Sequence, residues 1–146
     1  MTEAAVQACL GRPGGQPGEA GAVALVVFVD DTDLKYLRIL RRGFRHCFVA
    51  VASGDGWVIC DPLSHQTNLG FVGGLHEADL ASWYRALGLR VIETRTRPAP
   101  CRPAPIRPFT CVEAVKRVLG IHAPWVLTPW QLYRLMTQTL TGRGYT

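Results

Sequence analysis

The sequence predicts a single α+β domain. The chain has 146 residues, of which 48% are hydrophobic and 18% are charged, as in a globular protein of one domain. Strand patterns and helix patterns alternate irregularly and include a hairpin, which argues against a doubly wound parallel sheet. The Gly- and Pro-rich beginning predicts a flexible tail over residues 1–21, the domain over 22–141 and a short tail over 142–146.

The first half of the domain reads mainly as strands. The β-branched run Val23–Val29 predicts a strand buried on both faces, and the spacing of apolar residues in Leu34–Arg42 predicts a short helix. His46–Ala52 and Trp57–Leu63 are strand-like runs joined by Ser53-Gly-Asp-Gly56, which is strong turn chemistry. These two runs therefore predict an antiparallel hairpin.

The second half begins with a predicted loop and a predicted helix. Asn68–Gly74 is Gly-rich and predicts a loop, and Glu77–Leu87 has the pattern of an amphipathic helix ended by glycine. Arg90–Thr96 follows as a strand. Five prolines between Pro98 and Pro108 exclude helix and central strand, so they predict an extended surface connection.

Two further helices are predicted from their first residues. Thr110 followed by Glu113 forms a capping box, which makes Cys111 the first residue of one helix. Thr128-Pro129 is an N-cap with proline at the first position of the other, which runs to about Thr139.

Cys111 is the candidate nucleophile because a sulfur near the free N–H groups of a helix start favours the thiolate. Such a thiol needs a base and a third group that orients the base. His46 and Asp61 stand on the two hairpin strands, and with a turn near Gly54 they fall across from one another at its open end. On the Cys111 helix, Val115, Val118 and Leu119 share the side of the cysteine, so we expect its sulfur to face the interior.

The remaining cysteines are weaker candidates. Five cysteines, at positions 9, 47, 60, 101 and 111, contain no C-x-x-C pair, so neither a disulfide framework nor a zinc ribbon is indicated. Strand alternation directs Cys47 away from the side that His46 faces, and Cys60 away from Asp61. Both are expected to act as small buried hydrophobes in a reducing compartment.

The quoted segments resemble a known group of thiol enzymes. His46-Cys-Phe-Val-Ala-Val and Gly56-Trp57-Val-Ile-Cys-Asp61-Pro62 are similar to the H…GW…DP strands of transglutaminase-like papain-like proteins. The cysteine helix follows these strands here, an order that resembles the circularly permuted NlpC/P60 and lecithin:retinol acyltransferase-like group. Leu127-Thr-Pro-Trp-Gln-Leu-Tyr133 is similar to a segment that follows the cysteine helix in that group. The resemblance covers about residues 44 to 135, except 77–108.

The resemblance implies a papain-like fold with an antiparallel sheet and a packed catalytic helix. It makes Cys111 the nucleophile of a catalytic triad, His46 the general base and acid, and Asp61 the orienting group, with His65 as the alternative third member. The implied activity is that of a thiol hydrolase, such as a cysteine peptidase, or of an acyltransferase. Either would act on an amide or ester of a peptide, cell-wall peptide or acyl substrate through an acyl-enzyme. The alternative is a non-catalytic binding or assembly protein with contact surfaces in the Pro-rich 98–108 segment and the Arg-rich surface.

Other partners are not expected. Cys101, Cys111, His65 and His122 lack the spacing of a structural zinc site, so neither metal nor cofactor is predicted. The net charge is +5, but the densest basic stretch, residues 38–45, lacks interleaved aromatics apart from Phe44, which disfavours nucleic acid. The longest apolar run, at 22–29, is too short to span a membrane and follows no basic leader. We therefore expect a soluble, cytoplasmic protein.

Overall fold

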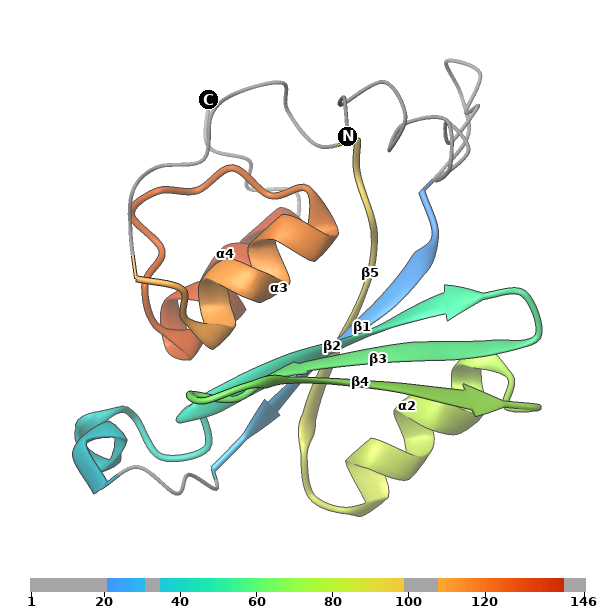
Figure 1. The fold of residues 1–146 in the computed structure, drawn as a ribbon, viewed down its shortest axis with the longest axis horizontal. Helices are drawn as coiled ribbons and strands as arrows, with labels where there is room; N and C mark the ends of the chain where they lie inside the picture. Colours follow the sequence, from blue (N-terminus) through green and yellow to red (C-terminus); the bar gives the residue numbers. More distant parts are fainter. Residues whose placement is uncertain (1–20, 31–34, 99–107, 141–146) are drawn as a thin grey trace.

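The computed structural model describes residues 21–30, 35–98 and 108–140, and it shows an α+β fold built on a five-stranded antiparallel sheet (Figure 1). The strands are β1 (Val23–Val29), β2 (His46–Ser53), β3 (Gly56–Pro62), β4 (Thr67–Gly73) and β5 (Arg90–Arg95), in the order β4-β3-β2-β1-β5. The helices are α2 (Glu77–Ala86), α3 (Cys111–Leu119) and α4 (Pro129–Leu140), with a 3-10 helix η1 at Lys35–Ile39. The predicted α+β class is confirmed.

Helices cover both faces of the sheet, with α3 and α4 on one side and α2 on the other (Figure 1). Strand β1 contributes to both cores by strict alternation. Val26 and Phe28 belong to the core beneath α3 and α4, whereas Leu25 and Val27 belong to the core beneath α2. All four are fully buried, which confirms that the first strand is covered on both faces.

The predicted hairpin of β2 and β3 forms, and its two strands separate at the open end. Gly54 adopts a φ of +62 in the turn, and pairing runs from Ser53↔Gly56 to Val49↔Cys60. Beyond that pair, β2 continues beside β1 as far as His46, while β3 continues beside β4 as far as Pro62. We call this divergence the fork between β2 and β3, and it is where the candidate site lies.

The prediction of a loop over Asn68–Gly74 is wrong. Residues Thr67–Gly73 form the edge strand β4, which pairs antiparallel with β3 along its whole length. The segment contains glycines and nearly all its side chains are exposed, so it lacks the apolar alternation from which a strand is predicted. An edge strand held by backbone hydrogen bonds needs no buried face of its own. Backbone pairing with β3, rather than the pattern of its own side chains, makes this segment a strand.

The prediction of a short helix over Leu34–Arg42 holds in part. The structure has the 3-10 helix η1 at Lys35–Ile39 rather than an α-helix, and Ile39 is 90% exposed. An apolar pattern makes an amphipathic helix only when a core receives its apolar face. The ends of the other predicted elements agree with the structure to within two residues. The tails at 1–20 and 142–146, and residues 99–107 of the Pro-rich connection, lie outside the described residues.

Helix α3 is fixed at its N-terminus and along its buried side. The Thr110 hydroxyl accepts a hydrogen bond from the Glu113 N–H at 3.3 Å, as the capping box predicts. The Glu113 carboxylate instead pairs with Lys116 at 2.9 Å and Arg117 at 3.1 Å. Lys116, only 4% exposed, also donates to the carbonyls of two residues in the α3–α4 loop, Ala123 and Val126. This network links the helix that carries Cys111 to the segment that leads into α4.

Helix α4 begins as predicted. The Thr128 hydroxyl accepts from the Gln131 N–H at 3.3 Å, and the Gln131 side-chain oxygen accepts from the Thr128 N–H at 3.0 Å. This reciprocal capping box places Pro129 at the first helical position. None of the helices in the described ranges has the length and apolar character required to cross a lipid bilayer.

Candidate active site

His46 and Asp61 are joined at the fork between β2 and β3. The Nε2 atom of His46 lies 2.7 Å from Oδ1 of Asp61, a short, charge-assisted contact. The two side chains are 17% and 31% exposed. Since the register of the hairpin pairs positions summing to 109, these residues are diagonal rather than directly opposite. The contact holds the imidazole in one orientation.

Cys111 completes a chain of three polar side chains. It begins α3 and packs against the core beneath that helix, and hydrogen bonding and charge couple the pKa of its thiol to that of His46. Because Asp61 holds Nε2 of the imidazole, Nδ1 is the ring nitrogen that remains for the sulfur. Three residues drawn from two strands and a helix therefore stand in the order thiol, imidazole, carboxylate.

Cys47 lies on the face of β2 opposite to Phe48, as strand alternation predicts, but this face is not remote from the candidate site. Cys47 is fully buried beneath α3, in the core against which Cys111 packs, and it is the strongest influence on the pKa of Cys111. Strand alternation is kept, but Cys111 contacts both neighbours in the strand. It can do so because the helix N-terminus stands over the fork, where β3 no longer flanks His46.

The surroundings of Cys111 stabilise its thiolate. The hydrogen bond from the Cys47 side chain is the largest influence on its pKa, and burial opposes it. The hydrogen bond and charge of His46 and the Cys47 backbone add to the first effect, so that the pKa of Cys111 falls to about 5. Burial alone would lower the pKa of His46, but its hydrogen bonds to Cys111 and Asp61 outweigh burial and raise that pKa. A thiolate–imidazolium pair is the expected state near neutral pH.

Cys47 and Cys60, the two cysteines near Cys111, have raised rather than lowered pKa values. The hydrogen bond to Cys111, followed by burial, raises the pKa of Cys47 well above its ordinary value, so Cys47 stays a thiol and donates its S–H. Burial and the charge of Asp61 raise the pKa of Cys60. Among the cysteines that the structure describes, only Cys111 has a lowered pKa.

The lowered pKa predicts an unusual pH profile for alkylation of Cys111. Its depressed pKa means that the thiolate is lost only as pH falls through about 5, so the iodoacetamide rate should be half-maximal there and level between pH 6.5 and 8. A free thiol, with a pKa of about 8.5, would still gain rate across that whole range. Mass spectrometry of the labelled Cys111 peptide measures the rate, and a midpoint near that of a free thiol would contradict this electrostatic account.

The other predicted site residues lie elsewhere. His65 is exposed in the turn between β3 and β4, so the carboxylate of Asp61 rather than His65 contacts His46. Val118 is 36% exposed instead of facing the interior with Val115 and Leu119. Cys101 lies outside the described residues.

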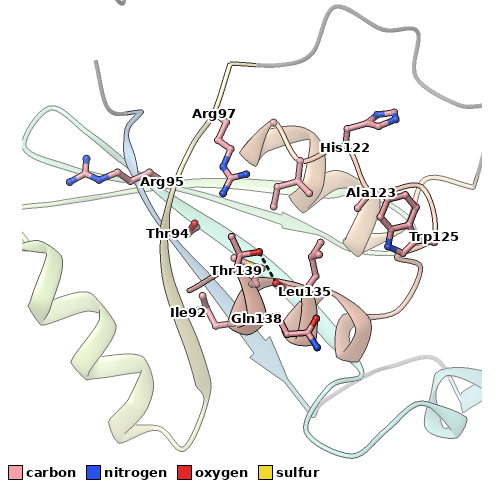
Figure 2. Close-up of a pocket in the computed structure, with 13 residues that line it drawn as sticks. Ile92, Thr94, Arg95, Arg97, His122, Ala123, Trp125, Leu135, Gln138 and Thr139 are labelled. Carbon is pink, nitrogen blue, oxygen red and sulfur yellow. Dashed lines mark hydrogen bonds between the residues drawn. The ribbon is translucent and has the colours of Figure 1, made fainter. Parts of the chain in front are cut away.

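His122 belongs to a separate cavity at the far end of α3. Figure 2 shows this cavity of about 410 Å³, which is lined by β5, the α3–α4 loop and α4. The guanidinium of Arg97 points toward the helices there, whereas that of Arg95 points away. His46, Asp61 and Cys111 are not among its lining residues.

Within the described ranges, no three His, Cys, Asp or Glu side chains are arranged to hold a metal ion. Comparison of the chain with models of protein families, with curated proteins and with solved structures found no match.

Proposed function

We propose that the protein is a cysteine-nucleophile hydrolase or acyltransferase with a papain-like fold in permuted order. The observation that carries the proposal is the connected set of Cys111, His46 and Asp61, in which the sulfur has a lowered pKa and the imidazole is oriented by a carboxylate. A buried structural cysteine needs neither feature, whereas a nucleophile needs both.

The residues have distinct roles in the proposed reaction. The Cys111 thiolate attacks the carbonyl carbon of an amide or ester, and the His46 imidazolium gives its proton to the leaving group. Water or an acceptor amine, deprotonated by neutral His46, then releases the acyl group from the sulfur. Asp61 keeps the Nδ1 side of the ring directed at the thiol throughout both steps.

The start of α3 supplies the electrostatic part of the mechanism. The Thr110 cap uses the N–H of Glu113, so the first N–H groups of the helix, on Cys111 and Val112, are not those bound by the cap. Donors at a helix N-terminus stabilise a negatively charged oxygen, and here they adjoin the attacking sulfur. These N–H groups are the proposed oxyanion donors.

The proposed substrate is a peptide, a cell-wall peptide or another acyl compound. Both His46 and Asp61 remain partly exposed, so an extended chain can reach the fork from solvent. Phe109, two residues before the nucleophile, is 61% exposed and is an apolar side chain near the start of α3. A large substrate with an apolar group near the scissile bond fits these features.

Acylation by an activated ester tests the proposal directly. The full chain is mixed with p-nitrophenyl acetate at pH 7, nitrophenolate release is followed, and the acetylated residue is identified by peptide mass mapping. We expect a burst of one product per chain with the acetyl group on Cys111, loss of the burst in Cys111→Ala and its retention in Cys60→Ala. Acetylation elsewhere, or a burst that survives Cys111→Ala, would overturn the proposal.

One observation favours the second candidate, a non-catalytic binding protein. The edge strand β4 exposes Leu69 and Phe71, which are 73% and 61% exposed on the strand that ends the sheet. Such an edge can accept a strand from a partner protein. Retention of partner binding in Cys111→Ala, combined with an absent acylation burst in the natural sequence, would favour this alternative.

A further inference from the structure

Two thiols adjoin at the candidate site, those of Cys111 and Cys47, and acyl transfer needs only the first of them. Cys47 is 0% exposed and lies on β2 within the core beneath α3, and Cys111 packs against that core from the first turn of the helix. Each thiol is the strongest single influence on the pKa of the other, as expected of side chains that adjoin in one core. Papain-like acyl transfer as proposed above assigns no chemical step to Cys47.

We propose that Cys111 and Cys47 form a reversible disulfide when Cys111 reacts with a hydroperoxide, and that this bond switches the nucleophile off. The inference concerns regulation of the proposed active site and rests on the reactivity of Cys111. Cys111 is the peroxide-sensing thiol, and Cys47 is the resolving thiol.

The two steps balance without a further oxidant. The Cys111 thiolate attacks one oxygen of the hydroperoxide, the O–O bond breaks, and Cys111 becomes a sulfenic acid while the peroxide is reduced to an alcohol or water. The Cys47 sulfur then attacks the Cys111 sulfur, and the hydroxyl leaves as water with the Cys47 proton. A thiol reductant restores both cysteines by exchange.

Burial decides which cysteine reacts first. Cys47 is fully enclosed and remains protonated, so of this pair a hydroperoxide meets Cys111, which is partly exposed. A buried resolving thiol in contact with the oxidised sulfur captures the sulfenic acid before a second peroxide can reach it. Sulfinic acid, which cellular reductants seldom reverse, is thereby avoided.

Cys60 offers a matched control within the same part of the structure. It also packs against the core beneath α3, from the neighbouring strand β3, but its pKa reflects burial and Asp61 rather than contact with Cys111. If simple proximity of any cysteine were enough, Cys60 would form the bond as readily as Cys47.

Peroxide titration followed by peptide mapping tests the proposal. In a full-length chain with Cys9→Ser and Cys101→Ser, one equivalent of hydrogen peroxide should remove about 2 Da and yield a single crosslinked peptide joining Cys47 to Cys111. Iodoacetamide labelling of Cys111 should be lost with the same dependence on peroxide and should return fully after dithiothreitol. Cys60→Ala in this background should behave identically.

Cys47→Ala should convert the reversible loss into an irreversible one. In this variant excess peroxide should add about 32 Da at Cys111, the mass of a sulfinic acid, and dithiothreitol should not restore labelling. Should the variant fold poorly by circular dichroism, the crosslinked peptide from the parent chain decides the matter alone. A sulfinic product without that crosslink in the parent, or a crosslink through Cys60, would overturn the proposal. If the crosslink is absent but the acylation burst is intact, only the redox proposal is rejected. If the crosslink forms but no burst is seen, the proposed function is rejected and the redox pair is retained.

Discussion

His46→Ala is expected to slow acylation of Cys111 by p-nitrophenyl acetate by about 10²- to 10⁴-fold at pH 7, the usual contribution of a general acid–base group. The substitution removes the proton carrier that lies between the sulfur and Asp61. It also removes a hydrogen bond and a positive charge that lower the pKa of Cys111, so the midpoint of the alkylation profile should rise. The hydrogen bond from Cys47 remains, so that midpoint should stay below the value of a free thiol.

His65→Ala is the matched control for this substitution. His65 is exposed in the turn between β3 and β4, four positions from Asp61, and its removal deletes the same side chain near the same strand end. The acylation rate and the alkylation midpoint should both be unchanged. Equal losses in the two variants would assign the effect to the hairpin as a whole, and an unaffected His46→Ala chain would remove the imidazole from the mechanism.

Lys116→Ala is expected to reduce the free energy of unfolding by about 3–5 kcal/mol, the usual result of removing one partner of a buried ion pair. The ammonium group lies 2.9 Å from Glu113 and donates to two buried carbonyls at 3.0 Å each, those of Ala123 and Val126. Its loss leaves these three acceptors without their shared donor. Since a domain of this size is stable by about 5–15 kcal/mol, the substitution should remove a large fraction of that stability.

Urea unfolding followed by tryptophan fluorescence measures this loss, and Arg117→Ala supplies the comparison. Arg117 contacts the same Glu113 carboxylate at 3.1 Å but is 46% exposed, so its removal should cost no more than about 1 kcal/mol. The double variant Glu113→Gln with Lys116→Met should lose less than Lys116→Ala, because it buries no uncompensated charge. A loss of under about 1 kcal/mol in Lys116→Ala would show that the network is dispensable.

The candidate site was largely predictable because its signals are local. Thr110 and Glu113 mark a helix start whatever the rest of the fold does, and they place Cys111 at its first position. The turn at Gly54 sets the hairpin register, which brings His46 and Asp61 to the same end of two strands. Capping and short turns depend on neighbours a few residues away, so sequence alone carries them.

Contacts between distant segments were not predictable in the same way. Strand β4 exists because β3 offers it backbone partners, and η1 is only a short 3-10 helix whose Ile39 is 90% exposed rather than packed in a core. The pairing of Lys116 with loop carbonyls likewise depends on where the chain returns after α3. These outcomes follow from non-local hydrogen bonds and burial, which hydrophobic periodicity does not encode.

The sequence by itself determined the α+β class, the hairpin, the capped start of α3 and the identity of the three polar residues, since each rests on periodicity, turns or caps within a short stretch of chain. Only the tertiary structure decided that Cys111 would contact both His46 and Cys47. Alternation along β2 sends those two side chains to opposite faces, and a single thiol reaches both because the strands part at the fork just where the helix begins. That meeting of three segments gives the sulfur its low pKa and a second thiol as its neighbour.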